Sequence, residues 1–237
     1  MGNFTSPGGT LVCEIWADGG IGQTWGSASG KGGGGGSYAR VELVTAPGDI
    51  LQFLDTGAGG ITKLTVAAVI KASAGNGGAG AGGGGVATVG DVLYNGGSGA
   101  NASDVNGFND DGGGGGGPAL RDTNGVSTPT TTSILGGVTS PGNFGGEGGG
   151  RFSSAPQPPE SGSSPGGGGG GAGNGNPSPG GSSGGYAVAV WTLANWNGNP
   201  QVGGTLPVSG ASPLYTEGAP QPAPPALDPT QRAAFVM

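Results

Sequence analysis

The chain lacks histidine altogether and has a single cysteine among its 237 residues. Without histidine it has neither the commonest general base nor the commonest neutral metal ligand. Ser-His-Asp and Cys-His catalytic arrangements are therefore excluded, and one cysteine cannot supply the ligands of a zinc site. A disulfide within the chain is equally excluded, and the apolar neighbours of Cys13 predict a buried, unreactive thiol.

Charge is also scarce, because charged residues make up 9% of the chain and the net charge is −7. Nucleic-acid binding needs clustered lysine and arginine, so this balance argues against a nucleic-acid partner and against an anionic membrane surface. No stretch approaches the ~20 apolar residues that span a bilayer. The N-terminus has no basic region followed by an apolar run, so we expect no signal peptide and no membrane insertion.

What the chain has instead is glycine: 63 residues, with unbroken runs at 32–36, 82–85, 112–117, 148–150 and 166–171. Ordinary usage is about 7%, and no Gly-X-Y period indicates collagen. Glycine loses more backbone entropy on folding than any other residue. Such a chain is therefore expected to fold only if its glycine backbones pack against one another or against strands.

Short apolar segments between the glycine runs predict strands, because hydrophobic and polar residues alternate along them. No segment keeps a 3.6-residue apolar period over three turns, so we predict an all-β protein, a small jelly-roll-like β-sandwich. Two of the strands flank a Thr-Ala-Pro-Gly turn and are predicted to form a hairpin, 37–44 with 49–54. The predicted strands are 10–17, 37–44, 49–54, 63–70, 86–89, 91–94 and 185–193.

These strands divide the chain into four parts. Residues 1–94 hold most of the sandwich, and residues 185–193 form its closing strand. Between them, residues 95–184 are a glycine-rich insertion without a strand-length apolar run. Its glycine runs are either disordered or form extended threefold polyglycine helices, which satisfy their backbone groups by pairing laterally.

The fourth part, residues 194–237, is a proline-rich arm. Proline excludes regular structure there and lowers the entropy cost of an extended conformation. An apolar end suggests an arm that inserts into a neighbouring protein, and the alternative is a floppy terminus. The candidate anchoring residues are Leu214, Tyr215, Leu227, Phe235, Val236 and Met237.

The order of the motifs resembles the glycine-rich domain of bacteriophage tail and fibre proteins. The residues that carry the resemblance are Phe4-Thr-Ser-Pro-Gly8 before the first strand, the run from Gly32 through Ser37-Tyr-Ala-Arg-Val41, the Thr45-Ala-Pro-Gly48 turn, Gly57-Ala-Gly-Gly60 and the closing Gly184-Gly-Tyr-Ala-Val-Ala-Val-Trp191. The resemblance implies a virion structural protein with a small β-sandwich and a glycine-rich face. It spans roughly residues 1–193, and the proline-rich arm has no counterpart in it.

Acidic residues gather at one place in the insertion. Asp104, Asp110 and Asp111 lie close in sequence to Asn106 and Asn109. Calcium takes such oxygen ligands, but the spacing fits no known loop pattern and no bidentate glutamate follows. These residues are weak calcium candidates, and a solvated polar loop is the alternative. We therefore expect no metal and no cofactor.

Aromatic residues in glycine-rich surroundings are the better binding candidates, because few neighbours there can bury them. They could stack on sugars or anchor into a partner, or they could pin glycine loops to the body of the protein. Aromatics on the predicted strands, Trp16, Tyr186 and Trp191, are expected in the core. The candidate binding residues are Trp25, Tyr94, Phe108, Phe144 and Phe152.

We therefore expect a non-enzymatic virion protein, a minor tail, tail-tip or fibre component whose glycine-rich face contacts the host. Its expected partners are other virion proteins, copies of itself, and a glycan or protein of the host surface. One alternative is a capsid decoration or head-fibre protein clamped by the arm. The other is a disordered, low-complexity linker. No sugar cleft or paired catalytic carboxylates are recognisable, so we expect no enzymatic activity.

Overall fold

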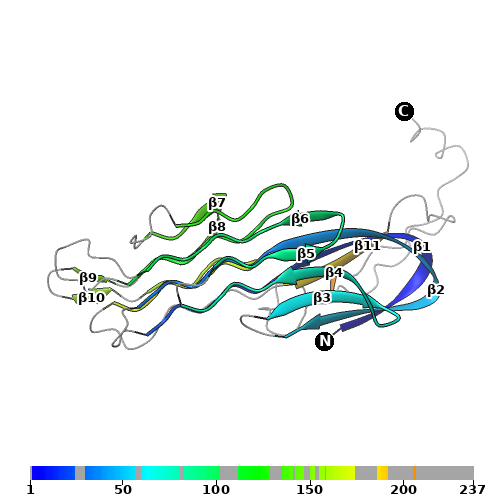
Figure 1. Cartoon of the computed structure of the whole chain (residues 1–237), viewed down its shortest axis with the longest axis horizontal. Helices are drawn as coiled ribbons and strands as arrows, with labels where there is room; N and C mark the ends of the chain where they lie inside the picture. Colours follow the sequence, from blue (N-terminus) through cyan, green and yellow to red (C-terminus); the bar gives the residue numbers. More distant parts are fainter. Residues whose placement is uncertain are drawn as a thin grey trace, which may run out of the picture.

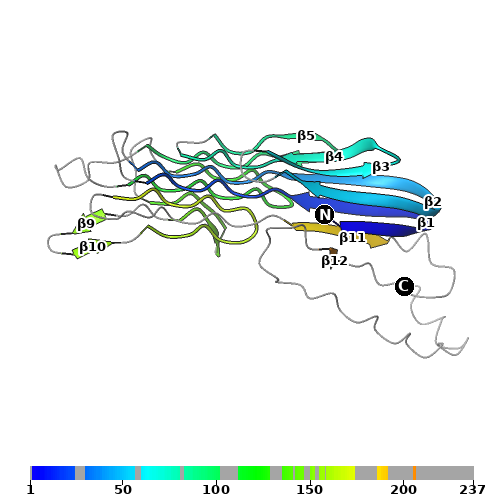
Figure 2. The same cartoon turned by 90° about the horizontal axis from the view of Figure 1, so that it is seen from below.

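The computed structural model shows two parts that follow one another along the long axis, a β-sheet and a bundle of extended glycine-rich segments (Figure 1). Figure 2 shows, from below, that the segments of the bundle continue the direction of the strands. The structure describes residues 2–24, 30–56, 60–80, 83–101, 112–128, 135–140, 142–146, 150–152, 155–157, 159–173, 186–191 and 205–206.

The sheet is antiparallel and has eight strands, in the order β12-β11-β1-β2-β3-β4-β5 with β6 beside β2. The described residues contain no helix, so the all-β prediction is confirmed. All eight strands belong to one hydrogen-bonded sheet, seven along the path and β6 as a branch from β2, so the jelly-roll sandwich stays a prediction. The strands of this sheet are β1 (Gly2–Trp16), β2 (Tyr38–Asp55), β3 (Ile61–Val66), β4 (Val69–Gly75), β5 (Ala87–Val89), β6 (Val92–Tyr94), β11 (Tyr186–Trp191) and β12 (Thr205–Leu206).

Two short ladders lie within the predicted glycine-rich insertion. The first pairs β7 (Val138–Ser140) with β8 (Asn143–Phe144), and the second pairs β9 (Gly150–Phe152) with β10 (Ala155–Gln157). Each strand of these ladders is only two or three residues long, which is too short for an alternation of apolar and polar residues to be recognised in the sequence.

The predicted hairpin of residues 37–44 and 49–54 is wrong. Both segments lie along the single long strand β2, which pairs with β1 from Tyr38 to Phe53. The two strands bend together where Pro47 lies opposite Pro7, and a Cβ on Gly8 would come within 2.7 Å of the Pro47 ring. Gly8 and Gly48 both have φ near +90°, a conformation that glycine adopts without strain. The Pro-Gly pair therefore marks a bend in paired strands.

The predicted single strand 63–70 is also corrected, because the chain reverses within it. Val66 pairs with Val69, so Ala67 and Ala68 form a two-residue turn between β3 and β4. The β-branched residues on both sides favoured an uninterrupted strand. Two alanines are not a usual turn signal, so the sequence pattern concealed the reversal.

The core of the sheet lies on one face of β1 and β2 and on the strands that follow them. Leu11, Cys13 and Ile15, alternate residues in the second half of β1, are fully buried there, as alternation predicts. The predicted burial of Cys13 is confirmed. The largest cluster contains Leu11, Cys13, Ile15, Ala17, Ala39, Val41, Leu43, Leu51, Phe53, Leu64, Ala72, Ala74 and Ala87.

Burial of Cys13 has a measurable consequence at high pH, because it raises the pKa of the thiol from 9.0 to about 12. The thiol therefore loses its proton at a lower pH in the unfolded chain than in the folded one. The contribution of Cys13 to the free energy of unfolding is fully present below pH 9.0 and is lost as the pH rises toward 12. We expect this group alone to lower the free energy of unfolding by ~1.4 kcal/mol per pH unit in that window. Urea titrations across the window will measure the slope. Cys13→Ala should flatten it, and an unchanged slope would contradict the assignment.

Glycine runs among the described residues form extended threefold helices. The backbone N–H groups of residues 32–36 donate in strict rotation to three neighbouring segments, 95–101, 166–173 and 76–80, and then to the first two again. A three-residue repeat is that of an extended polyglycine helix, so this alternative is the one observed for the run 32–36. The acceptors are the carbonyl oxygens of Ala100, Gly169, Gly78, Gly97 and Gly166, at 2.6–2.9 Å.

Small polar side chains tie the outer segments of the bundle together. The N–H of Asn95 donates to the side chain of Asn124 (2.7 Å), and three residues later Ser98 donates in the same way to Ser127 (3.0 Å). The side-chain oxygen of Asn95 also accepts the N–H of Ala87 (3.0 Å). Where backbone pairing ends, side chains at the threefold spacing therefore supply the missing partners.

Candidate functional site

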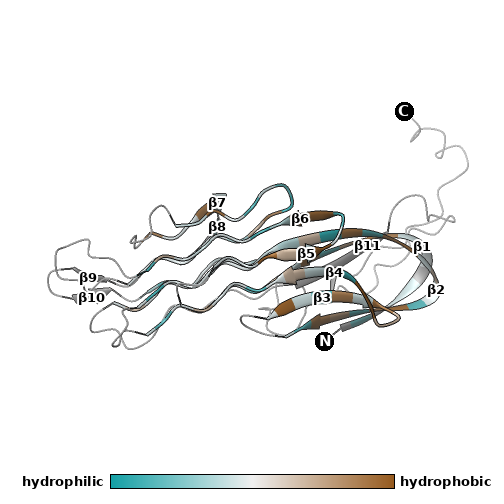
Figure 3. Cartoon of the chain, viewed as in Figure 1, coloured by the Kyte–Doolittle hydropathy of each residue, from teal (hydrophilic) through white to brown (hydrophobic). Residues whose placement is uncertain are grey.

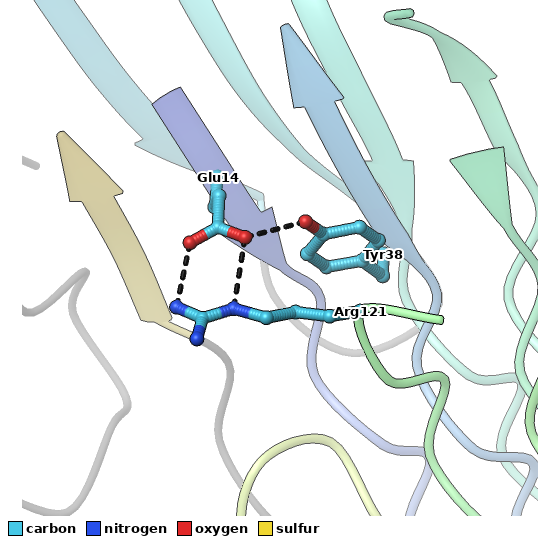
Figure 4. Close-up of polar contacts among 3 residues, drawn as sticks. All are labelled: Glu14, Tyr38 and Arg121. Carbon is cyan, nitrogen blue, oxygen red and sulfur yellow. Dashed lines mark hydrogen bonds and ion pairs between the residues drawn. The ribbon is translucent and has the colours of Figure 1, made fainter. Parts of the chain in front are cut away.

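The most connected polar cluster lies where the sheet meets the bundle (Figure 4). Glu14 on β1 is only 6% exposed, yet its carboxylate is fully engaged. Arg121 donates to both carboxylate oxygens, from Nε at 2.9 Å and from Nη2 at 2.6 Å. The Tyr38 hydroxyl donates a third bond at 2.5 Å. Such a bidentate, charge-assisted arrangement is among the stronger hydrogen-bonding geometries in proteins.

Aromatic rings complete this cluster. The Arg121 guanidinium lies 5.4 Å from the ring centre of Trp16, and the Trp16 and Tyr38 rings are 4.9 Å apart. Tyr94 of β6 stacks on Tyr38 at 6.1 Å. Because Arg121 lies two residues after the glycine segment 112–119, the cluster fastens the end of that segment to β1 and β2.

The chemistry of the cluster suits a structural contact between the sheet and the bundle better than it suits catalysis. Burial, then the hydrogen bond and the negative charge of Glu14, hold the pKa of Tyr38 well above its ordinary value. The tyrosine is therefore a neutral donor at physiological pH, and Glu14 is shared between it and a guanidinium. The raised pKa of Tyr38 takes this hydroxyl further from the value near 7 that suits a general acid or base.

A second polar junction connects β4 with the start of the bundle. The side-chain oxygen of the buried Asn76 accepts from the N–H of Asp18 (3.3 Å) and from the Thr62 hydroxyl (3.1 Å). Its amide nitrogen donates to Asp55 (3.2 Å). The sheet and the bundle are therefore linked by polar side chains at two places.

The other end of the bundle gathers several segment ends. Gly113 donates to Gly30 and receives a bond from Gly171, while Ala172 donates to Gln23, all at 2.8–2.9 Å. We call this the free end, because residues Ala17, Gly36, Ala119 and Gly166 join the same segments at the sheet. The chain leaves the free end after residues 24, 101 and 173, and it returns there at residues 30 and 112.

Most sequence-predicted site residues lie outside the described residues. These are Trp25 and Phe108, the calcium candidates Asp104, Asp110 and Asp111, and the arm residues Leu214, Tyr215, Leu227, Phe235, Val236 and Met237. The backbones of Phe144 and Phe152 lie in β8 and β9, and their side chains are not described. Tyr94 is partly buried against Tyr38.

Sequence reasoning missed the pairing of Glu14 with Arg121. The two residues are 107 positions apart, and no local pattern joins them. The available signal was weak: Glu14 interrupts an apolar strand, and Arg121 is a cation at the end of a glycine run. A buried carboxylate needs a partner, but the sequence alone does not say which cation supplies it.

Two kinds of feature are absent from the described ranges. Within them, no three histidine, cysteine, aspartate or glutamate side chains gather as metal ligands would. The same ranges hold no helix that is long and apolar enough to cross a membrane.

Comparison with protein-family models, with curated proteins and with solved structures gives no match for this chain.

Proposed function

We propose that this chain is a non-enzymatic structural protein of a bacteriophage particle, a tail-tip or fibre component whose glycine bundle contacts the host surface. The observation that carries the proposal is the bundle itself. Its interior consists of backbone hydrogen bonds between glycine-rich segments, so it is an extended scaffold whose side chains are left for its surface and its free end.

The two junctions support this role. The buried Glu14 and Asn76 are each engaged by several partners from both parts of the molecule. Such connections hold the bundle in a fixed direction relative to the sheet, which suits a protein that presents one end to a partner. The resemblance of the strand and glycine motifs to phage tail and fibre domains points to the same class of protein.

The free end is the part of the bundle that we assign to the host surface. Two connections that begin and end there, residues 25–29 and 102–111, contain the aromatic candidates Trp25 and Phe108. Aromatic side chains dominate the affinity of many interfaces. The expected ligand is a glycan or a protein of the bacterial surface.

Cryo-electron microscopy of intact particles tests the location. A few copies at the end of the tail, with the free end toward solvent, would support the proposal. Hundreds of copies on the shell would instead show a decoration protein, and particles without the chain would refute any virion role.

The host-contact role predicts an effect on adsorption. Particles carrying Trp25→Ala together with Phe108→Ala should adsorb to host cells about tenfold more slowly, the loss expected for removing interface aromatics. The matched control is Val126→Ala, which removes an exposed apolar side chain on another part of the bundle. Equal adsorption by both variants would remove the two aromatics from the contact.

A further inference from the structure

The long strand β2 has an open edge in its middle. On the side away from β1, β6 pairs with β2 only as far as Arg40, and β3 pairs with it only from Leu51 onward. Residues 41–50 therefore have no partner on that side among the described strands. The strongly hydrophobic residues of the molecule lie mainly on the strands of the sheet, whereas the glycine bundle is pale (Figure 3). An open edge on such a sheet is a template for a further strand.

The backbone groups of Val44 point out of this edge. The carbonyl oxygen of Arg40 accepts the N–H of Asp91 there (2.8 Å). Alternate residues of an antiparallel strand direct their N–H and C=O groups to the same side, so those of Glu42 and Val44 follow Arg40. Val44 is also 87% exposed. Another strand can therefore approach β2 at this residue.

Two carboxylates occupy the N–H groups on either side of Val44. The N–H of Glu42 donates to Oδ2 of Asp91 (2.7 Å), and the N–H of Ala46 donates to Oδ2 of Asp49 (2.8 Å). Asp91 reaches this edge from the turn between β5 and β6, 49 positions away in sequence. Among the described residues, neither aspartate forms an ion pair. A strand added at Val44 would have to displace both carboxylates to reach the neighbouring donors.

The same two carboxylates oppose pairing with a second copy of the chain. Two copies of β2 that paired antiparallel about a two-fold axis at Val44 would place Glu42 of one opposite Ala46 of the other. Asp91 of each copy would then meet Asp49 of the other. Like charges in such a contact repel.

We propose that Asp49 and Asp91 prevent the open edge of β2 from pairing with β2 of a second copy, and so keep the chain from associating edge to edge. They act in two ways. They occupy the donors that an added strand needs, and they place charge where that strand would lie. This protection belongs to the sheet and does not depend on the phage assignment.

Other open edges of the sheet carry different obstacles to pairing. β11 pairs with β1 only from Leu11 onward, and the first half of β1 contains Pro7, which has no N–H to donate. β5 pairs with β4 only at Ser73 and Ala74. In the first half of β4 a register shift leaves Lys71 unpaired with β3, and lysines and bulges both disfavour strand addition. Protection of the β2 edge therefore fits the rest of the sheet.

Analytical ultracentrifugation of the purified full chain tests the proposal. Asp49→Ala together with Asp91→Ala frees both donors and removes the repulsion, so this variant should associate at a concentration about tenfold lower than the unaltered chain does. The matched control, Asp122→Ala together with Glu160→Ala, removes the same charge from exposed residues outside the sheet. Unchanged association of the first variant, or equal association of the control, would overturn the proposal.

Two further measurements distinguish edge pairing from loss of folding. Val44→Lys, added to the first variant, places a charge on the edge without touching the core, so it should restore the behaviour of the unaltered chain. Hydrogen exchange at the Val44 amide should be fast in the unaltered chain and slow in the associated variant. Association that survives Val44→Lys, or a Val44 amide that stays fast in the associated variant, would place the contact elsewhere and refute the role of this edge.

Discussion

Replacing Gly33 with alanine is expected to destabilise the bundle by about 4 kcal/mol, at the upper end of what single substitutions do. The new Cβ would lie 2.0 Å from the carbonyl oxygen of Gly20. Gly33 also donates to Gly169 and accepts from Gly116, so the neighbouring backbones cannot retreat without breaking hydrogen bonds. Overpacking against backbone has no flexible side chain to absorb it.

Gly83→Ala is the matched control. No atom lies within 4 Å of its added Cβ, and its φ is not in the left-handed region. This substitution should raise the free energy of unfolding by less than about 1 kcal/mol, because alanine reduces the conformational entropy of the unfolded chain. Urea denaturation measures both, and amide hydrogen exchange shows whether the loss is confined to the bundle. Similar values for the two variants would contradict close packing of glycine backbones around Gly33.

The sequence was sufficient for the class of fold and for most strands because those depend on local patterns. Alternation along residues 10–17 and 185–193 predicted strands that pair with each other in the structure. The two errors in the sheet also have local causes. The Pro47-Gly48 pair is a turn signal that β2 uses as a bend, and Ala67-Ala68 is a turn without a turn signal.

The arrangement of the bundle could not be derived in the same way. Successive glycines are identical, so nothing in residues 32–36 says which neighbour each N–H will meet. In a sheet, side chains fix the register because a slip of one residue exposes the core. Here the register is set at the ends of the segments, by residues such as Asn76 and Arg121 whose partners are distant in sequence.

Arg121→Met should therefore lower the free energy of unfolding by more than the exposure of the Arg121 side chain suggests. Its side chain is 65% exposed, and an ordinary surface ion pair contributes less than about 1 kcal/mol. Its partner Glu14, however, is buried on β1. Removing the cation leaves an unpaired carboxylate in the junction, which costs about 3–5 kcal/mol for a fully buried pair. Because solvent reaches the guanidinium, we expect about 2 kcal/mol here.

A double-mutant cycle with Glu14→Gln distinguishes this mechanism from simple loss of packing on Trp16. Glutamine can still accept the Tyr38 hydrogen bond but carries no charge. In the Glu14→Gln background Arg121→Met should cost less than half as much, because no buried anion is left unpaired. If Arg121→Met costs the same in both backgrounds, the stacking on Trp16 rather than the ion pair fastens the bundle to the sheet. Hydrogen exchange of the 112–119 amides would show which segment is released first.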